Sequence, residues 1–384
     1  MNAAARLATR TQALANGRVL TPEGFREDCC VVLSGDTIAA IEAAPPADAD
    51  VIDLNGGTLL PGFIDVQVNG GGGRLFNDDP SVETIRTIAE THRRFGTTGL
   101  LPTLISDDLS VVEAAIRAID AAIEAGVPGV LGIHIEGPFL SQARRGIHSE
   151  GKIRPLEDRF LALLESGRFG RTLVTLAPEA ATPEQIRRLT RAGVIVAAGH
   201  SDAPYETVRA AIEAGLSGFT HIFNAMSQLT ARAPGMVGAA LDSDAYAGII
   251  ADGYHLHPAT LRIALHAKGP ERLMLVTDAM PSVGSAEESF LIHGRAIHRE
   301  GDRLVGADGT LAGSTLTMAG AVKGMMAQAG VSLEEAARMA SATPAAFLGL
   351  GDRLGAIAPG YRADLVLVDA ALEVQASWIG GARL

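Results

Sequence analysis

Residues 129–139, GVLGIHIEGPF, form an apolar run with one carboxylate, Glu136, at its downstream end. Gly137 and Pro138 follow at once and predict that a strand stops there. Three more apolar runs end in the same way: VIVAAGHSD (194–202) reaches His200, GFTHIFNAM (218–226) reaches His221, and LMLVTDAM (273–280) reaches Asp278. Because histidine and carboxylate side chains are common ligands of catalytic zinc, these strand ends indicate a metal-dependent hydrolase.

The chain around these runs alternates between predicted helices and strands. Apolar residues at helical spacing, closing on glycine, predict helices within residues 80–96, 106–126 and 182–193. Eight strands are predicted, at residues 62–68, 99–105, 129–136, 172–179, 194–200, 218–224, 247–253 and 273–279. This order predicts an α/β fold, a (β/α)8 TIM-like barrel whose active site lies at the C-terminal ends of its strands.

An open doubly wound sheet would show the same alternation. However, no GxGxxG motif follows the first predicted strand, and the glycine run 70–73 is better interpreted as a tight turn. In the barrel, the four polar strand-end residues stand after the third, fifth, sixth and eighth strands. They would therefore meet at one end of the barrel.

Short β-like runs separated by turn residues occupy both ends of the chain. Neither end is long enough to bury a sheet alone, so we expect residues 1–58 and 356–384 to pack together as a small β-sandwich domain. Residues 59–355 would form the metal-dependent barrel. The length of 384 residues suits a barrel of about 250 residues with such an appended domain.

The composition, with 47% hydrophobic and 20% charged residues, is that of a globular enzyme. A net charge of -12 argues against binding to nucleic acids or acidic membranes, which requires a broad basic face. The adjacent Cys29 and Cys30 form no spaced motif and indicate a reducing compartment. We recognise no signal-peptide pattern and no run of about 18 apolar residues, so we expect a cytoplasmic protein.

Glu136, His200 and His221 are the predicted metal ligands, because catalytic zinc usually takes three protein ligands and keeps one position for water. As a structural residue, a buried Glu136 would be an unpaired charge, which is strongly unfavourable. Asp278 is the remaining group. A carboxylate beside an activated water is a candidate proton carrier.

Several other histidines have ordinary interpretations. His134 lies two residues before Glu136 and shares its strand face, but it lies one layer deeper, so we expect a hydrogen-bonded core residue. His92 lies in a polar helix and is expected to be exposed to solvent. The histidines without a strand-end position are expected at the surface: His257, His266, His293 and His298.

Six segments resemble the N-acetylglucosamine-6-phosphate deacetylases of the amidohydrolase superfamily: HIEGPF (134–139), GHSDA (199–203), THIFNAMS (220–227), GIIADGYH (248–255), LVTDAM (275–280) and GTLAGSTLTM (309–318). The first strand, in LLPGFIDVQVNGGGG (59–73), resembles the opening strand of the superfamily. The resemblance implies hydrolysis of the acetamide of N-acetylglucosamine 6-phosphate to glucosamine 6-phosphate and acetate. It also assigns Glu136, His200 and His221 to the metal, and Asp278 as general base and then general acid.

Most members of the superfamily carry an HxH pair on the first strand to hold a second metal, and the corresponding positions here are Gln67 and Asn69. An amide is a poor ligand for a divalent transition metal compared with imidazole. We therefore predict one divalent metal per chain, most simply Zn²⁺. Gln67 and Asn69 either hydrogen-bond to water or substrate, or only close the strand, and weak binding of a second metal near them stays open.

The resemblance also implies the substrate contacts. His148, in the loop after the third strand, would be a second catalytic residue that contacts the substrate carbonyl; the alternative is a mobile surface histidine. Arg232 would bind the sugar phosphate from a neighbouring subunit, so a homodimer is expected. The other implied substrate-binding residues are Ile147, Asn224, Ala225, His255, Leu311, Ala312 and Gly313.

Three alternative functions stay open at this point. The galactosamine epimer of the substrate fits the same motifs. Another amidohydrolase, dihydroorotase-like or aminoacylase-like, would use the same ligands, because the ligand set does not select the acyl group. A catalytically silent barrel could serve as a binding module, although the presence of all three ligands and Asp278 speaks against it.

Overall fold

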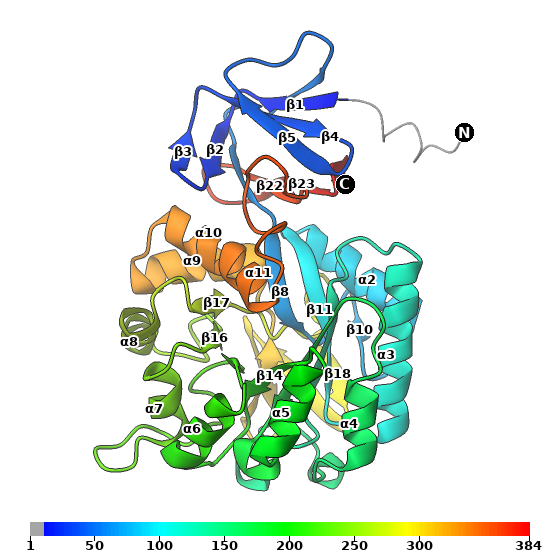
Figure 1. Cartoon of the computed structure of the whole chain (residues 1–384), viewed down its shortest axis with the longest axis vertical. Coiled ribbons are helices and arrows are strands. Elements are labelled where there is room, and N and C mark those ends of the chain that lie inside the picture. Colours follow the sequence, from blue (N-terminus) through cyan, green and yellow to red (C-terminus); the bar gives the residue numbers. More distant parts are fainter. Residues whose placement is uncertain (1–10) are drawn as a thin grey trace.

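A nearly closed barrel of eight parallel strands forms the centre of the molecule (Figure 1). Pairing of Val68 with Ala279, and a 3.0 Å hydrogen bond from the Asp278 amide to the Gln67 carbonyl, join the first barrel strand to the chain after the last. The computed structural model thus confirms the predicted (β/α)8 barrel. Its strands are β8 Phe63–Val68, β11 Thr97–Ile105, β12 Gly132–Glu136, β13 Arg171–Leu176, β14 Ile195–Ala198, β15 Gly218–Phe219, β16 Tyr246–Ile249 and β17 Leu273–Leu275.

The structure describes residues 11–384, so residues 1–10 of the predicted β segment 1–58 lie outside the described residues. Strands β14, β15 and β17 are shorter than predicted, because they stop at Ala198, Phe219 and Leu275. The polar residues predicted at these strand ends therefore lie just beyond the hydrogen-bonded ladder.

Helices surround the barrel, and the three predicted ones are confirmed. In α5, Thr182 and Gln185 form a capping box, and Ile186 and Leu189 are buried against the sheet. The helices are α2 Val82–Arg93, α3 Leu109–Glu124, α4 Asp158–Leu164, α5 Pro183–Arg191, α6 Tyr205–Glu213, α7 Gly235–Leu241, α8 Pro258–Lys268, α9 Met318–Ala329, α10 Leu333–Ala340 and α11 Ala342–Phe347, with 3₁₀ turns at Gln142–Arg144, Glu150–Lys152 and Pro178–Ala180. No helix among residues 11–384 is long and apolar enough to cross a lipid bilayer.

Strands from both ends of the chain form two sheets beside the barrel (Figure 1). Their shared core contains Leu33 and Leu59 from the N-terminal part and Trp378 from the C-terminal part. The chain passes from β7 directly into β8, so these sheets join the barrel at the N-terminal ends of its strands. They comprise β1 Thr11–Ala15, β2 Arg18–Thr21, β3 Gly24–Arg26, β4 Cys30–Ser34, β5 Thr37–Glu42, β6 Asp50–Asp53, β7 Thr58–Pro61, β22 Leu365–Val368, β23 Val374–Ile379 and β24 Ala382–Arg383.

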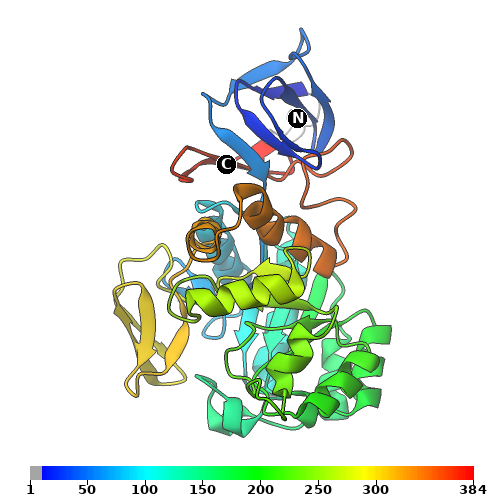
Figure 2. The ribbon, with the colours of Figure 1, turned by 90° about the vertical axis from the view of Figure 1, so that its left-hand side faces the viewer.

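A further antiparallel sheet lies between β17 and α9, to one side of the barrel in Figure 2. We did not predict it, because its first two strands, β18 and β19, are mostly exposed or partly exposed and carry little apolar alternation; in β19 only Ile297 is buried. The sheet consists of β18 Ser289–Ile292, β19 Arg295–Glu300, β20 Arg303–Gly306 and β21 Leu311–Ser314. The glycine run 70–73 forms a short hairpin of β9 Gly70–Gly71 and β10 Arg74–Leu75, which confirms the predicted turn.

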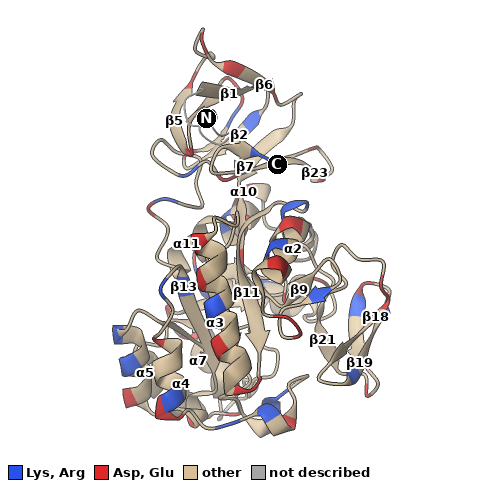
Figure 3. Ribbon diagram, turned by 90° about the vertical axis from the view of Figure 1, so that its right-hand side faces the viewer, with Lys and Arg blue, Asp and Glu red and all other residues tan. Residues whose placement is uncertain are grey.

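Charged residues of both signs lie along α3, α4 and α5 (Figure 3). Several form ion pairs, such as Arg188 with Glu165 at 2.7 Å. These pairs are partly exposed and each stabilises the fold only slightly. Apolar side chains instead fill the space between helices and strands, in a continuous core that includes Ile116, Ile133 and Leu189.

The helix α2 buries His92 completely, so the prediction that this side chain is exposed was wrong. His92 Nε2 donates to the Gly70 carbonyl at 2.9 Å. The residue shares its helix face with the buried Ile85 and Ile88, and its polar neighbours along the sequence hid that face. Burial lowers the pKa of His92 to about 4. His293, also expected at the surface, is partly buried and bonds Asp107 at 3.1 Å.

His92 should make the protein sensitive to acid. The unfolded chain binds a proton on this residue near pH 6.5, whereas the folded chain does so only near pH 4, so stability falls as the pH drops through this window. His92→Gln keeps a donor for Gly70 but has no titrating group. Between pH 7 and pH 4.5 the variant should lose about 2 kcal/mol less apparent unfolding free energy than the wild type, measured by urea denaturation. The exposed His298→Gln serves as control; equal losses for His92→Gln and wild type would refute the prediction.

Candidate metal centre and active site

Three buried side chains converge at the C-terminal end of the barrel, each from a different strand end. Glu136 is the last residue of β12, and His200 and His221 follow β14 and β15 by two residues each. The Nε2 atoms of the two histidines lie 3.0 Å apart, and each lies 3.0 Å from Oε1 of Glu136. The three donor atoms therefore form a triangle with equal edges.

This triangle fits a divalent metal. Tetrahedral ligands at about 2.0 Å from zinc are about 3.3 Å from one another, close to the observed edges. His200 Nδ1 lies 2.9 Å from the Arg144 carbonyl oxygen, which can only accept, so the ring hydrogen is on Nδ1 and Nε2 keeps its lone pair. Burial alone would raise the pKa of Glu136, but the neighbouring imidazoles of His200 and His221 hold that pKa well below its usual range. Two imidazole nitrogens and an ionised carboxylate are a zinc-type donor set.

His148 lies at the edge of the same cluster. Its ring centroid is 4.5 Å from that of His200, and ligand atoms of Glu136, His148 and His200 lie within 4.8 Å of one another. However, the Ser106 backbone N–H, which can only donate, points at His148 Nδ1 from 3.3 Å. The neutral ring therefore carries its hydrogen on Nε2, which cannot then bind a metal. This favours His221 over His148 as the third ligand and leaves His148 as a hydrogen-bond donor.

Asp278 is held beside the cluster by two amide side chains. Oδ1 of Asp278 accepts from Asn69 Nδ2 at 2.6 Å and from Gln67 Nε2 at 3.2 Å. The same Gln67 nitrogen donates to Oε2 of Glu136 at 3.2 Å. Burial, followed by the charge of Glu136, raises the pKa of Asp278 to about 6. Such a carboxyl group can both take up and return a proton near neutral pH.

Three of these residues have a left-handed backbone conformation. His200, His221 and Asp278 have φ angles of 50°, 30° and 51°. A non-glycine residue in this region costs about 1–3 kcal/mol, and such residues concentrate at functional sites. The conformation also explains the short strands, because the chain turns out of the ladder before each of these residues.

A cavity of about 360 Å³ opens over these groups. The predicted site residues that line it are Glu136, Ile147, His148, His200, His221, Asn224, Ala225, His255, Asp278, Leu311 and Gly313. Ala312 lies between two lining residues, but its side chain is buried in a cluster with Met280 and Ile297. Arg232 lies in an exposed loop and does not line the cavity of its own chain.

His255 is oriented by a neighbouring carboxylate. Asp252 Oδ2 lies 2.6 Å from His255 Nδ1, and Asp252 Oδ1 accepts from the backbone amides of Tyr254 and His255 at 2.9 Å each. Burial would raise the pKa of Asp252, but the bond with His255 and these amides keep it below its usual value. The ionised carboxylate only accepts, so the His255 hydrogen is on Nδ1 and Nε2 is left for a ligand.

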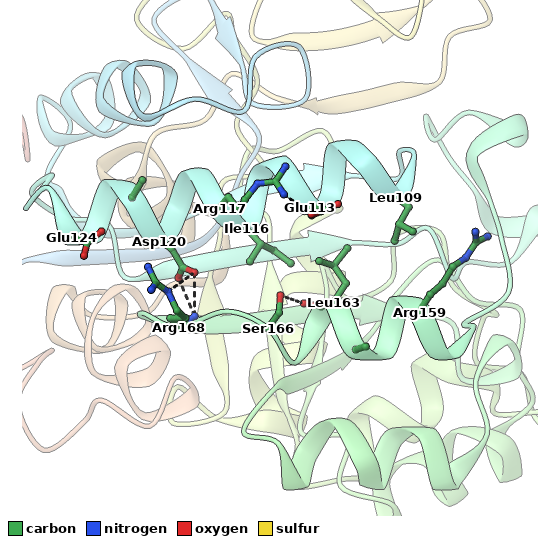
Figure 4. A pocket seen from close by; sticks show the side chains of 12 residues that line it. Leu109, Glu113, Ile116, Arg117, Asp120, Glu124, Arg159, Leu163, Ser166 and Arg168 are labelled. Carbon is green, nitrogen blue, oxygen red and sulfur yellow. Dashed lines mark hydrogen bonds and ion pairs between the residues drawn. The ribbon is translucent and has the colours of Figure 1, made fainter.

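A larger cavity, of about 700 Å³, lies on the outer surface between α3 and α4 (Figure 4). Several of its charged groups are already paired: Arg117 bonds Glu113, and Asp120 accepts from the Phe169 amide at 2.9 Å. Its described lining contains no histidine or cysteine, and it lies away from the strand ends. Despite its larger size, this surface cavity is therefore not the candidate active site.

Sequence reasoning missed one residue that supports the site, Asp65. Asp65, two residues before Gln67, is fully buried and accepts from Thr277 Oγ1 at 2.5 Å, which anchors the residue before Asp278. A carboxylate inside the apolar run of the first strand was a visible signal. His134 is a buried core residue bonded to Thr175 at 2.7 Å, as predicted.

Comparison with known proteins gives a consistent result. Residues 58–383 match the model of the Amidohydrolase family. The chain is 48% identical to the N-acetylgalactosamine-6-phosphate deacetylase of Shewanella sp. (strain ANA-3), over 96% of this chain and 94% of that protein. It is 36% identical to the N-acetylglucosamine-6-phosphate deacetylase of Haemophilus influenzae, over 96% and 98%. The crystal structure of N-acetylglucosamine-6-phosphate deacetylase from Pasteurella multocida superposes with a TM-score of 0.95 at 35% identity, covering 97% of this chain and 99% of that one.

Proposed function

The chain belongs to the amidohydrolase family, and from this premise we propose that it removes the acetyl group of an N-acetylhexosamine 6-phosphate, releasing the amino sugar 6-phosphate and acetate. One observation carries the proposal: the donor atoms of Glu136, His200 and His221 meet at 3.0 Å in the cavity that Asp278 lines. Relatives that align over nearly the whole chain are named for this reaction.

We propose one divalent metal per chain, most simply Zn²⁺, held by Glu136, His200 and His221. When bound, the ion would polarise the acetamide carbonyl and make a water molecule acidic enough to attack near neutral pH. Gln67 and Asn69 direct their amide hydrogens at carboxylates rather than offering imidazole nitrogens, which supports a single ion.

The chain's own residues would move the protons. Asp278 accepts the proton of the attacking water and then delivers it to the amide nitrogen, so that the carbon–nitrogen bond breaks with a neutral amine as leaving group. His148 donates from Nε2 to the carbonyl oxygen as negative charge develops there. A preorganised donor of this kind contributes roughly 3 kcal/mol to transition-state stabilisation.

Phosphate binding would be local, because the net charge of the protein is -12. We propose that His255, Asn224 and Ala225 face the sugar phosphate, and that Ile147 and the segment 311–313 contact the sugar. Arg232 is exposed in its own chain, which is compatible with a homodimer in which it reaches the neighbouring cavity. Sedimentation velocity would measure the dimer.

We also propose a cytoplasmic location, where the buried Cys29 and Cys30 would stay reduced.

A panel of four substrates tests the function: N-acetylglucosamine, N-acetylgalactosamine and the 6-phosphate of each. We expect acetate release from at least one phosphate, with kcat/KM about 10- to 100-fold above its unphosphorylated form, because charged hydrogen bonds to phosphate are strong. The galactosamine epimer is a full second candidate, since the relative with 48% identity is named for it. Release of acetate from neither phosphate by the zinc-loaded protein would overturn the proposal.

A further inference from the structure

Ser106 contacts His148 through two atoms. It follows the last residue of β11, and both side chains are buried, each with 1% relative exposure. The Ser106 amide nitrogen lies 3.3 Å from His148 Nδ1, and the Ser106 Oγ lies 2.8 Å from the same atom. No other hydrogen-bond partner of the His148 ring exists among residues 11–384, so its Nε2 is left for the cavity that the ring lines.

These two contacts determine where the imidazole carries its hydrogen. A backbone N–H cannot accept, so Nδ1 of His148 must be the acceptor. The Ser106 hydroxyl can rotate its hydrogen toward the same lone pair. A neutral imidazole with Nδ1 as acceptor carries its hydrogen on Nε2, which is the form that can donate to an oxygen atom in the cavity.

The surroundings hold the Ser106 hydroxyl in place. A Cβ atom at Gly137 would lie 2.3 Å from Ser106 Oγ, so the glycine after the ligand Glu136 leaves the room that this hydroxyl occupies. The loop that carries His148 is also tied to the residues after Ser106, because Lys152 Nζ lies 2.8 Å from Asp107 Oδ1. The positions of both Ser106 and His148 are therefore restrained.

We propose that Ser106 is a positioning residue that keeps His148 in the tautomer with hydrogen on Nε2. It acts through His148 and touches no reacting atom. The identity of the group that accepts the His148 Nε2 hydrogen, the carbonyl oxygen of the acyl group, rests on the proposed function. The assignment of the tautomer does not.

Imidazole ¹⁵N chemical shifts test the tautomer directly, because protonated and unprotonated ring nitrogens resonate far apart. In the zinc-loaded, histidine-labelled protein, His148 should show an unprotonated Nδ1 and a protonated Nε2. Ser106→Ala removes the shorter contact, 2.8 Å from the hydroxyl, and keeps the 3.3 Å amide contact, so both shifts should move part of the way toward the opposite tautomer, and Ser106→Thr should restore them. Ser282→Ala, at a buried serine whose hydroxyl has no hydrogen-bond partner within residues 11–384, is the matched control and should leave the His148 shifts unchanged.

Kinetics then test the consequence. Ser106→Ala should lower kcat about 10-fold with KM changed less than twofold, because one buried hydrogen bond to His148 is lost. In a His148→Ala background the same substitution should change kcat no further. A normal kcat in Ser106→Ala, or a lower kcat with unchanged ¹⁵N shifts, would overturn the proposal. If instead the proposed function is wrong, the wild type and all variants should release no acetate, while the ¹⁵N shifts of His148 should still show the expected tautomer.

Discussion

Replacing Asp278 with asparagine should lower kcat by about 10³-fold or more, because the variant loses the carboxylate that we propose as the carrier of the proton from water to the amine. The substitution preserves shape, and the new amide oxygen can still accept from Asn69 and Gln67, which now bond Asp278 at 2.6 and 3.2 Å. The three ligand atoms come from other residues, so the zinc content should stay at about one equivalent per chain. Acetate release and elemental analysis on the same sample measure both effects.

Asp242 is exposed and does not line the cavity, so Asp242→Asn is the matched control and should retain full activity. If Asp278→Asn kept wild-type turnover, another group would have to carry the proton. If it lost its metal, Asp278 would be a ligand rather than a proton carrier, and the assignment of Glu136, His200 and His221 as the complete set would fail.

Replacing Glu136 with glutamine should remove the metal and with it nearly all activity. Oε1 of Glu136 is the charged corner of the ligand triangle, 3.0 Å from both histidine nitrogens, and a neutral amide is a poor ligand. The zinc content measured by elemental analysis should fall from about one equivalent per chain to a small fraction of that, and kcat should fall by several orders of magnitude. Activity should return partly when excess zinc is added, which distinguishes this variant from Asp278→Asn.

Glu165→Gln changes a carboxylate on the barrel surface and should leave metal content and turnover unchanged. Two equivalents of zinc in the wild-type protein would contradict the single-metal proposal and the role given to Gln67 and Asn69. A fully loaded Glu136→Gln would show that the ion binds elsewhere.

The barrel was predictable because its signal is local. Each strand is an apolar run whose end is marked by a polar residue or by glycine, as at Glu136 and Gly137, and each helix has its own apolar period. The sheet β18–β21 lacks that signal in its first two strands, which bury one residue each, and its four strands pair with one another. The prediction that His92 is exposed failed for a related reason. The burial of this side chain depends on a hairpin more than twenty positions away in the chain, and no local sequence pattern shows that contact.

The sequence by itself determined the (β/α)8 barrel and the four strand-end residues Glu136, His200, His221 and Asp278, because strand periodicity and strand order place such residues at one end of the barrel. Only the tertiary structure showed how their side chains are held and oriented. The left-handed backbone at three of them, the amides of Gln67 and Asn69 on the carboxylates, and the contact of Ser106 with His148 join residues far apart in the chain. Hydrogen-bond direction, on which we base the proposed ligand and donor roles of the three histidines, exists only once those partners meet in the folded protein.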